Sequence, residues 1–167
     1  FRNDMRFDKM SLGMMPSYLF GKGPGSVVPG GMHAFIKTDP SLDVPDVEFL
    51  FRGIPNDAHM WFPGIRKPYL DGFAIRAAIL HPKSRGEVRL RSSNPIDPVI
   101  IDFNFFSDPD DLDRLRTGFK LARDVAYQKA LDPYRGEQIE PGPDVKTDND
   151  LDEFIRQTAG TVEHPVA

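Results

Sequence analysis

The sequence predicts an α+β domain in which one antiparallel β-sheet of about five to six strands is backed by helices. Residues 87–91 alternate strictly between charged and apolar side chains, as a half-buried strand does. Residues 107–111 read Ser-Asp-Pro-Asp-Asp, a typical helix start. The 167 residues are 40% hydrophobic, which suits one domain, or one lobe of a larger protein, with a substantial core.

At the N-terminal end, loosely helical spacing of apolar residues predicts a helix within residues 3–20. Asn3 or Asp4 is expected to cap it and Gly21 to close it. Pro16 is expected to break it into two pieces. The methionines of this segment could form a soft ligand-facing surface, but filling a core is the interpretation we favour.

The glycine-rich residues 21–26 do not form a nucleotide-binding loop by our interpretation. A dinucleotide fingerprint needs a strand before it and a helix after it, and neither pattern is present here. Pro24 also removes one backbone donor. We therefore expect a flexible turn.

Five segments have the composition of strands: 32–37, 47–51, 73–80, 87–91 and 99–105. The second segment alternates so that Val47, Phe49 and Phe51 share one apolar face, while the other face is mixed. The third and fourth are expected to pair as a hairpin across the polar turn 81–86.

The last third of the chain predicts two helices. The first begins at residues 107–111, should end near Leu131, and carries this apolar stripe: Leu112, Leu115, Phe119, Ala122, Val125 and Ala126. The second opens at Thr147 with a capping-box pattern. Its inward side chains are expected to be Leu151, Phe154 and Ile155.

Composition argues against several classes of function. The net charge is −4 with no basic stripe, which is unlike a nucleic-acid-binding protein. The chain has no cysteine, so disulfides and thiolate catalysis are excluded for it. No run of 18 apolar residues is present, so we expect no membrane span. A cytoplasmic location is a separate expectation. Because the chain begins Phe-Arg-Asn-Asp, we expect it to start within a longer sequence.

Aromatic residues on the proline-rich loop 53–71 are candidates for a binding site. His59, Trp61 and Phe62 lie there, and Phe51 precedes them on a strand. Such residues form either a small cluster under the loop or the wall of a pocket, and the sequence leaves both open. No metal site is expected, because the four histidines are far apart and none forms an i, i+4 pair.

The C-terminal segment holds the candidate catalytic residue, His164. Pro165 follows it and holds the histidine backbone away from the helical region. Imidazole exchanges protons near neutral pH, so a fixed histidine can act as a base. The alternative is a surface histidine near a chain end.

Several motifs resemble those of the glucose-methanol-choline (GMC) oxidoreductases. They are Leu-His-Pro-Lys-Ser-Arg-Gly-Glu-Val-Arg-Leu-Arg-Ser at 80–92, Asn-Pro at 94–95, Pro-Val-Ile at 98–100, Asp-Pro-Asp-Asp at 108–111 and His-Pro-Val at 164–166, with matches also at 38–40 and 45–47. Their order along the chain agrees with the family, and within it the chain looks closest to bacterial choline-dehydrogenase-like enzymes. Here the His-Pro-Val motif continues with Ala167 where the family usually has Gly-Thr-Cys.

The resemblance implies that residues 1–167 are the substrate-binding lobe of a larger FAD-dependent enzyme whose FAD-binding domain is the main partner. The substrate would be a small alcohol, oxidised at its CH–OH group by hydride transfer to flavin N5. His164 would serve as base or hydrogen-bond partner, with Trp61, Phe62, Phe51 and His59 as substrate-binding candidates.

Two further site assignments follow from the resemblance. Pro165 and Val166 would lie against the cofactor. Glu163, next to the histidine, could favour a cationic substrate, raise the pKa of His164, or point to solvent. A homo-oligomer, a non-catalytic binding lobe and a lyase on the same scaffold remain open alternatives.

Overall fold

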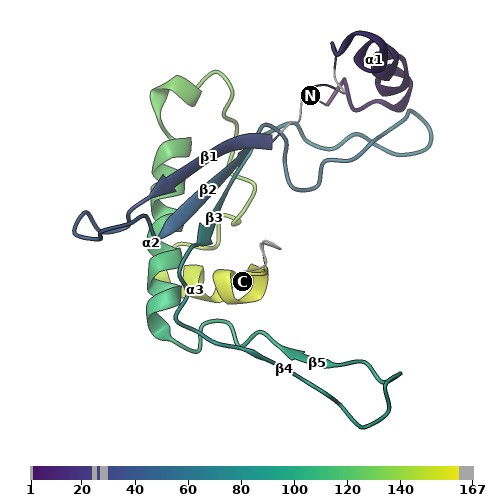
Figure 1. Cartoon of the computed structure of the whole chain (residues 1–167). Coiled ribbons are helices and arrows are strands. Elements are labelled where there is room, and N and C mark those ends of the chain that lie inside the picture. The colour runs from purple at the N-terminus through teal and green to yellow at the C-terminus, as the bar shows by residue number, and fades with distance from the viewer. Residues whose placement is uncertain (1, 24–25, 27–29, 162–167) are drawn as a thin grey trace. The chain divides into compact units, whose positions relative to one another are not determined.

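The computed structural model describes residues 2–23, 26 and 30–161 of the chain, and its fold is α+β (Figure 1). The elements in chain order are α1 (Phe7–Phe20), β1 (Gly30–Ile36), β2 (Val47–Arg52), β3 (Ala74–Ile79), β4 (Glu87–Arg89), β5 (Ile100–Asp102), α2 (Pro109–Ala126), the short 3-10 helix η2 (Lys129–Leu131) and α3 (Asp148–Thr158). The predicted class is confirmed. Among the described residues, no helix is both long and apolar enough to cross a bilayer.

The contacts within the chain define two compact units. The first comprises Phe1–Ala34, Phe49–Arg76 and Ala122–Glu137, and the second comprises Phe35–Glu48, Ala77–Leu121 and Gln138–Ala167. Each unit is assembled from three separate stretches of sequence, so neither could be recognised as a continuous domain.

The described strands form two sheets where the sequence predicted one. Strands β1, β2 and β3 form a three-stranded sheet in that order, and β4 pairs with β5 in a separate antiparallel ribbon. The expected hairpin between segments 73–80 and 87–91 is therefore wrong, because β3 lies beside β2 and Glu87 pairs with Asp102. The physical reason lies in the connection 81–86, which is bound to the start of α2 as described below.

The second unit has a small core between α2 and α3. Leu112, Leu151 and Ile155 are its buried members, and the partly buried side chains around them are Phe106, Leu115, Phe119, Val145, Phe154 and Ala159. The predicted inward residues of α3 are thus confirmed. On α2, Val125 is exposed, because the helix ends one residue later and the following turn is the 3-10 helix η2.

Close packing of α2 against β2 and β3 depends on Gly118. A Cβ atom built on this glycine would lie 3.0 Å from Val47 Cγ1 and 3.7 Å from Ala77 Cβ. Val47 itself is completely buried. A glycine on α2 therefore lets the helix approach the sheet closely.

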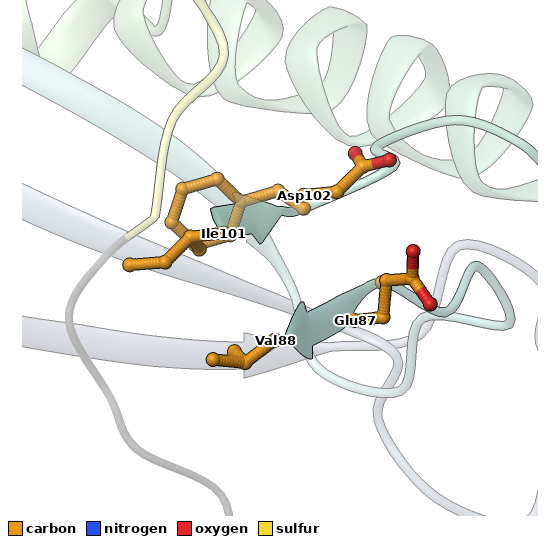
Figure 2. Close-up of a pocket in the computed structure, with 6 residues that line it drawn as sticks. Glu87, Val88, Ile101 and Asp102 are labelled. Carbon is orange, nitrogen blue, oxygen red and sulfur yellow. The ribbon is translucent and has the colours of Figure 1, made fainter. Parts of the chain in front are cut away.

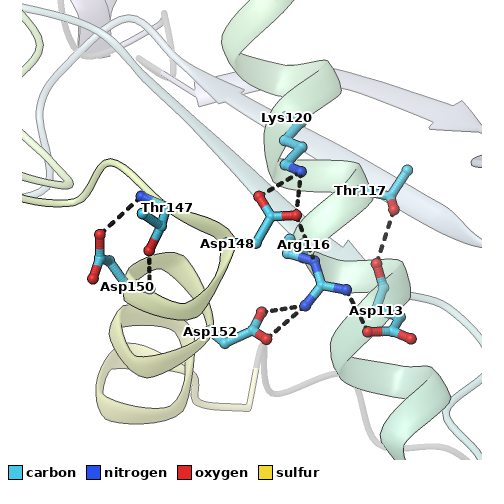
Figure 3. Close-up of polar contacts among 8 residues, drawn as sticks. All are labelled: Asp113, Arg116, Thr117, Lys120, Thr147, Asp148, Asp150 and Asp152. Carbon is cyan, nitrogen blue, oxygen red and sulfur yellow. Dashed lines mark hydrogen bonds and ion pairs between the residues drawn. The ribbon is translucent and has the colours of Figure 1, made fainter.

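Helix α3 begins with the predicted capping box (Figure 3). Thr147 Oγ1 accepts a bond from the Asp150 backbone N–H at 3.2 Å, and Asp150 Oδ2 accepts one from the Thr147 N–H at 2.8 Å. Arg116 on α2 donates to both carboxylate oxygens of Asp152 on α3, at 2.7 and 2.5 Å. Lys120 reaches Asp148 in the same way, so ion pairs fix α2 against α3.

Helix α1 differs from its prediction in three ways. It is continuous from Phe7 to Phe20 with Pro16 inside it, so the expected break is wrong. Arg6 occupies the cap position without a side-chain cap bond, in place of Asn3 or Asp4. None of its residues is buried, so its methionines do not fill a core within the described chain. Gly21 does close the helix, in the left-handed conformation that glycine favours.

Strand β2 is buried more evenly than its alternation predicted. Glu48, assigned to the mixed face, is only 4% exposed. Asp46, directly before the strand, is buried and accepts bonds from the Thr38 backbone N–H at 2.7 Å and from Thr38 Oγ1 at 2.5 Å. These two acids show that this end of β2 carries polar groups within the protein interior.

Candidate functional site

Trp61 joins the loop 53–71 to the N-terminal segment within the first unit. Its indole Nε1 donates to the Arg2 carbonyl at 2.7 Å, and its backbone N–H donates to the Met5 carbonyl at 3.3 Å. Its own carbonyl accepts from the Phe7 N–H at 2.9 Å. Because both ends of the tryptophan are held, its ring has a fixed place on the loop.

A recess lies beside this tryptophan. It has a volume of about 430 Å³ and is lined by Trp61, Pro63, Gly64, Ile65, Arg66, Lys67 and Pro68. That volume is in the range of small-molecule sites. Phe62 is absent from this lining; its backbone instead closes a tight turn with Arg66, in which Gly64 has a φ of 82°.

His59 is tied to the loop backbone. Its ring nitrogens lie 2.7 Å from the Asp57 carbonyl oxygen and 3.1 Å from the Lys67 carbonyl oxygen. The ring also meets Tyr69 edge-on, with centroids 5.5 Å apart. His59 therefore braces the loop, and both of its nitrogens are already occupied by protein groups.

Tyr69 is a feature that the sequence did not single out. Its ring is 4% exposed, and its hydroxyl is a buried polar atom without a hydrogen-bond partner among the described residues. Burial and then the negative charge of Asp71 raise the pKa of this phenol. A buried hydroxyl without a hydrogen-bond partner is costly in a folded protein. One tyrosine in a loop gives no sequence signal for this.

Phe51 lies apart from the recess lining. Its ring stacks on Phe73, with centroids 5.5 Å apart and planes inclined by 23°. Of the four aromatic candidates in this unit, Trp61 alone lines the recess, while His59 and Phe51 make the contacts described above.

The motif at 81–86 is bound to the N-terminal end of α2 in the second unit. Asp111 is 1% exposed and accepts from the backbone N–H groups of Lys83 and Ser84, each at 2.8 Å. Ser84 Oγ accepts from the Asp108 N–H at 3.0 Å. We call these four residues the loop clamp. Burial acts to raise the pKa of Asp111, but the bonds from Ser84 and Lys83 outweigh it and the pKa lies below its usual value.

The loop clamp holds the loop 81–86 at the start of α2 and so sets the direction of strand β4, which follows this loop. Gly86 is required there, because a Cβ on it would lie 2.1 Å from the Asp102 carbonyl oxygen. The residues that carry the sequence resemblance at 81–86 thus have a structural role here, which is to fix the β4–β5 ribbon.

The candidate catalytic segment lies outside the described residues. This applies to Glu163, His164, Pro165 and Val166, so their predicted roles stay predictions. In the part of the chain that is described, no group of three or more His, Asp or Glu side chains is placed to hold a metal ion.

The start of the glycine-rich segment does not fit a dinucleotide cradle. Such a cradle lies between a strand and the N-terminus of a helix, where backbone N–H groups face the phosphates. The glycine-rich residues 21–26 instead begin at the C-terminal end of α1, where carbonyl groups are exposed. Residues 21–23, where the structure describes them, therefore do not have the position of a phosphate-binding loop.

Comparison with known proteins agrees with the motifs. The sequence model of the GMC oxidoreductase family matches residues 82–167. The oxygen-dependent choline dehydrogenase of Pseudomonas fluorescens (strain SBW25) is 38% identical over 131 residues, which are 78% of this chain and 22% of that protein. The oxygen-dependent choline dehydrogenase of Brucella ovis is 34% identical over 147 residues, which are 88% of this chain and 26% of that protein.

A solved structure supports the fold. The chain is similar to pyridoxine 4-oxidase from Mesorbium loti with a TM-score of 0.58 and 21% identity, over 74% of this chain and 24% of that one. The chain spans about a quarter of the length of the curated relatives it matches.

Proposed function

Because the chain belongs to the GMC oxidoreductase family, we propose that it is the substrate-binding part of an FAD-dependent alcohol oxidoreductase. The observation that carries the proposal is the 38% identity to an oxygen-dependent choline dehydrogenase over 131 residues. The chain is proposed to work with an FAD-binding domain of the same polypeptide, because it matches the GMC oxidoreductase family and spans about a quarter of its relatives' length.

The reaction proposed is oxidation of a CH–OH group. The bound flavin would accept the hydride at N5 when the alcohol is oxidised. His164 would take the hydroxyl proton, or donate a hydrogen bond that stabilises the developing alkoxide. Pro165 would orient this imidazole by restricting the backbone beside it, and would lie with Val166 against the cofactor.

The substrate proposed is a small alcohol, with choline as the first candidate. The relatives named above are choline dehydrogenases, and Glu163 would place a negative charge beside the histidine, where it would attract a quaternary ammonium group. Trp61 offers an aromatic ring of fixed position to the same kind of cation. Phe62, Phe51 and His59 are proposed as further substrate-binding residues outside the recess that Trp61 lines.

The test uses the full-length protein that contains this chain. The flavin absorption is recorded under anaerobic conditions before and after the addition of choline, pyridoxine and a series of primary alcohols. We expect bleaching with at least one of them, slowed by about 100-fold or more in His164→Ala, since general bases contribute on this order. His81→Ala is the matched control, because His81 is an exposed histidine next to a proline.

Two results would count against the proposal. A flavin that none of these alcohols bleaches would remove the alcohol oxidoreductase assignment. Equal bleaching rates in His164→Ala and His81→Ala would remove the assigned role of His164.

A further inference from the structure

The β4–β5 ribbon has one apolar face and one charged face. Val88 lies directly opposite Ile101, and Glu87 lies directly opposite Asp102. Residues that face each other across an antiparallel pair project to the same side, and neighbours along a strand project to opposite sides. Figure 2 shows the side chains of Val88 and Ile101 next to one another, with the carboxylates of Glu87 and Asp102 beyond them.

The apolar face continues beyond the paired residues. If the register is extended by one residue, Leu90 lies opposite Val99, on the same side as Val88 and Ile101. Phe103 follows two residues after Ile101 and lines the same hollow. Every residue of this set is apolar; we call Val88, Leu90, Val99, Ile101 and Phe103 the ribbon face.

The ribbon face is open to solvent in the described structure. Val88 is 70% exposed, Leu90 78% and Ile101 56%, and the two others are also exposed. Soluble proteins rarely leave a contiguous apolar patch of this kind uncovered. A two-stranded ribbon is also marginally stable by itself in water. Both arguments require a covering partner for this face.

The hollow at the ribbon is smaller than most small-molecule sites. Its volume is about 220 Å³, which is below the range of about 300–1,000 Å³ typical of small-molecule sites. The face extends along both strands, so polypeptide fits it better than a small ligand does. The opposite side carries three charged residues, Glu87, Arg89 and Asp102, and one partly buried apolar residue, Ile100, opposite Arg89. Arg89 Nε lies 3.4 Å from Glu87 Oε1, so this side is the more polar of the two.

We propose that the ribbon face is a docking surface for the FAD-binding domain of the same polypeptide. This inference rests on the proposed function. The family match begins at residue 82 and therefore includes the whole ribbon, so the surface belongs to the part shared with the family. The relatives are about three and a half times as long as this chain, so they contain the additional polypeptide that such a surface needs.

The loop clamp supports this role mechanically. Lys83 and Ser84 are bound by buried Asp111, and Asn104 Nδ2 donates to the Arg85 carbonyl at 2.9 Å. Both strands of the ribbon are thus held at the Glu87–Asp102 end, beside the start of α2. A surface held in this way meets its partner with less loss of conformational freedom.

The test compares the two faces of one strand in the full-length protein. Val88→Cys places a thiol on the ribbon face, and Glu87→Cys places one on the opposite face, one residue away. The chain itself has no cysteine, so labelling can be assigned to a tryptic peptide of this region. Both variants are treated with a maleimide in the native and the urea-unfolded protein, and the flavin absorption of each is recorded.

The proposal predicts that in the native protein the Val88→Cys thiol reacts at least about tenfold more slowly than the Glu87→Cys thiol, and that the two react equally after unfolding. Equal native rates would overturn it. Protection that disappears on dilution would also overturn it, because the occupant would then be a second copy of the chain. If Val88→Cys prevents folding, Ile101→Cys against Asp102→Cys gives the same comparison.

The labelling rates and the flavin spectrum are separate measurements, so failure of the docking proposal can be distinguished from failure of the proposed function. If the Val88→Cys thiol is protected in a colourless protein, the ribbon face is covered by a domain that does not bind FAD. That result would overturn the proposal that the partner is an FAD-binding domain. A yellow protein with equal labelling would retain the proposed function and reject the docking surface.

Discussion

Replacing Asp111 by asparagine tests the loop clamp. The carboxylate is 1% exposed and accepts two backbone N–H bonds of 2.8 Å. Asparagine keeps one acceptor oxygen but turns an NH₂ group toward the second donor. One bond to a charged acceptor contributes about 1.5–3 kcal/mol, and a buried donor without a partner costs about 1–3 kcal/mol. Since these contributions overlap, we expect a loss of about 2–4 kcal/mol in the free energy of unfolding.

The assay is urea unfolding followed by far-ultraviolet circular dichroism. With an m-value of about 1–3 kcal/mol per molar, the midpoint of Asp111→Asn should fall by roughly 1–2 M. The control is Asp110→Asn, since the neighbouring Asp110 is an exposed acid that pairs with Lys83 and Arg114. We expect this control to stay close to the wild type, because exposed pairs contribute little.

The same pair of variants makes a pH prediction. The pKa of Asp111 is depressed in the folded chain, so its contribution is present above the unfolded carboxyl pKa of about 4 and is lost as pH falls below it. The difference between wild type and Asp111→Asn should therefore shrink between neutral pH and about pH 3. A difference that is small at neutral pH, or that does not change with pH, would refute the role assigned to the clamp.

Three further predictions concern packing and ion pairs. Gly118→Val should destabilise the chain by about 1–3 kcal/mol, because the valine side chain would overlap Val47. Thermal unfolding measures this loss, and an unchanged midpoint would contradict the close approach of α2 to the sheet. A double-mutant cycle on Arg116 and Asp152 should give a coupling of about 1 kcal/mol that weakens in 1 M salt, as both side chains are about one-fifth exposed. No coupling would contradict the stabilising role assigned to this pair. Gly86→Ala should loosen the β4–β5 ribbon and speed amide exchange there, because its Cβ would meet a backbone oxygen; unchanged exchange would argue against the strand geometry.

Local sequence rules predicted the parts of the fold that depend on neighbouring residues. The capping box of Thr147 and Asp150 is present, and Asp108 accepts from the Asp110 N–H at the start of α2. Gly21 closes α1 as expected. Each of these features depends on residues that lie close together in the sequence. The local pattern was therefore sufficient to predict them.

Pairing over longer distances could not be predicted in this way. Segment 87–91 reads as the second strand of a hairpin, but Asp111 holds the preceding loop from a distance of 27 residues and turns β4 toward β5. In the sequence this acid was recognised only as a first-turn residue of a helix. Glu48 likewise reads as a solvent-facing residue, and its burial depends on tertiary contacts.

For the candidate site, the sequence identified residue types better than their arrangement. Trp61 does line a recess, while His59 is bound to the loop backbone and Phe51 stacks on Phe73. The buried hydroxyl of Tyr69 appears only once the loop has folded. The role of His164 stays a prediction.

The most direct measurement of the central proposal is the visible absorption spectrum of the purified full-length protein, followed by analysis of the cofactor released on denaturation. We expect a yellow protein that releases FAD in stoichiometric amount. A colourless protein that releases no flavin, and that does not acquire the spectrum when FAD is added, would contradict the assignment as an FAD-dependent alcohol oxidoreductase.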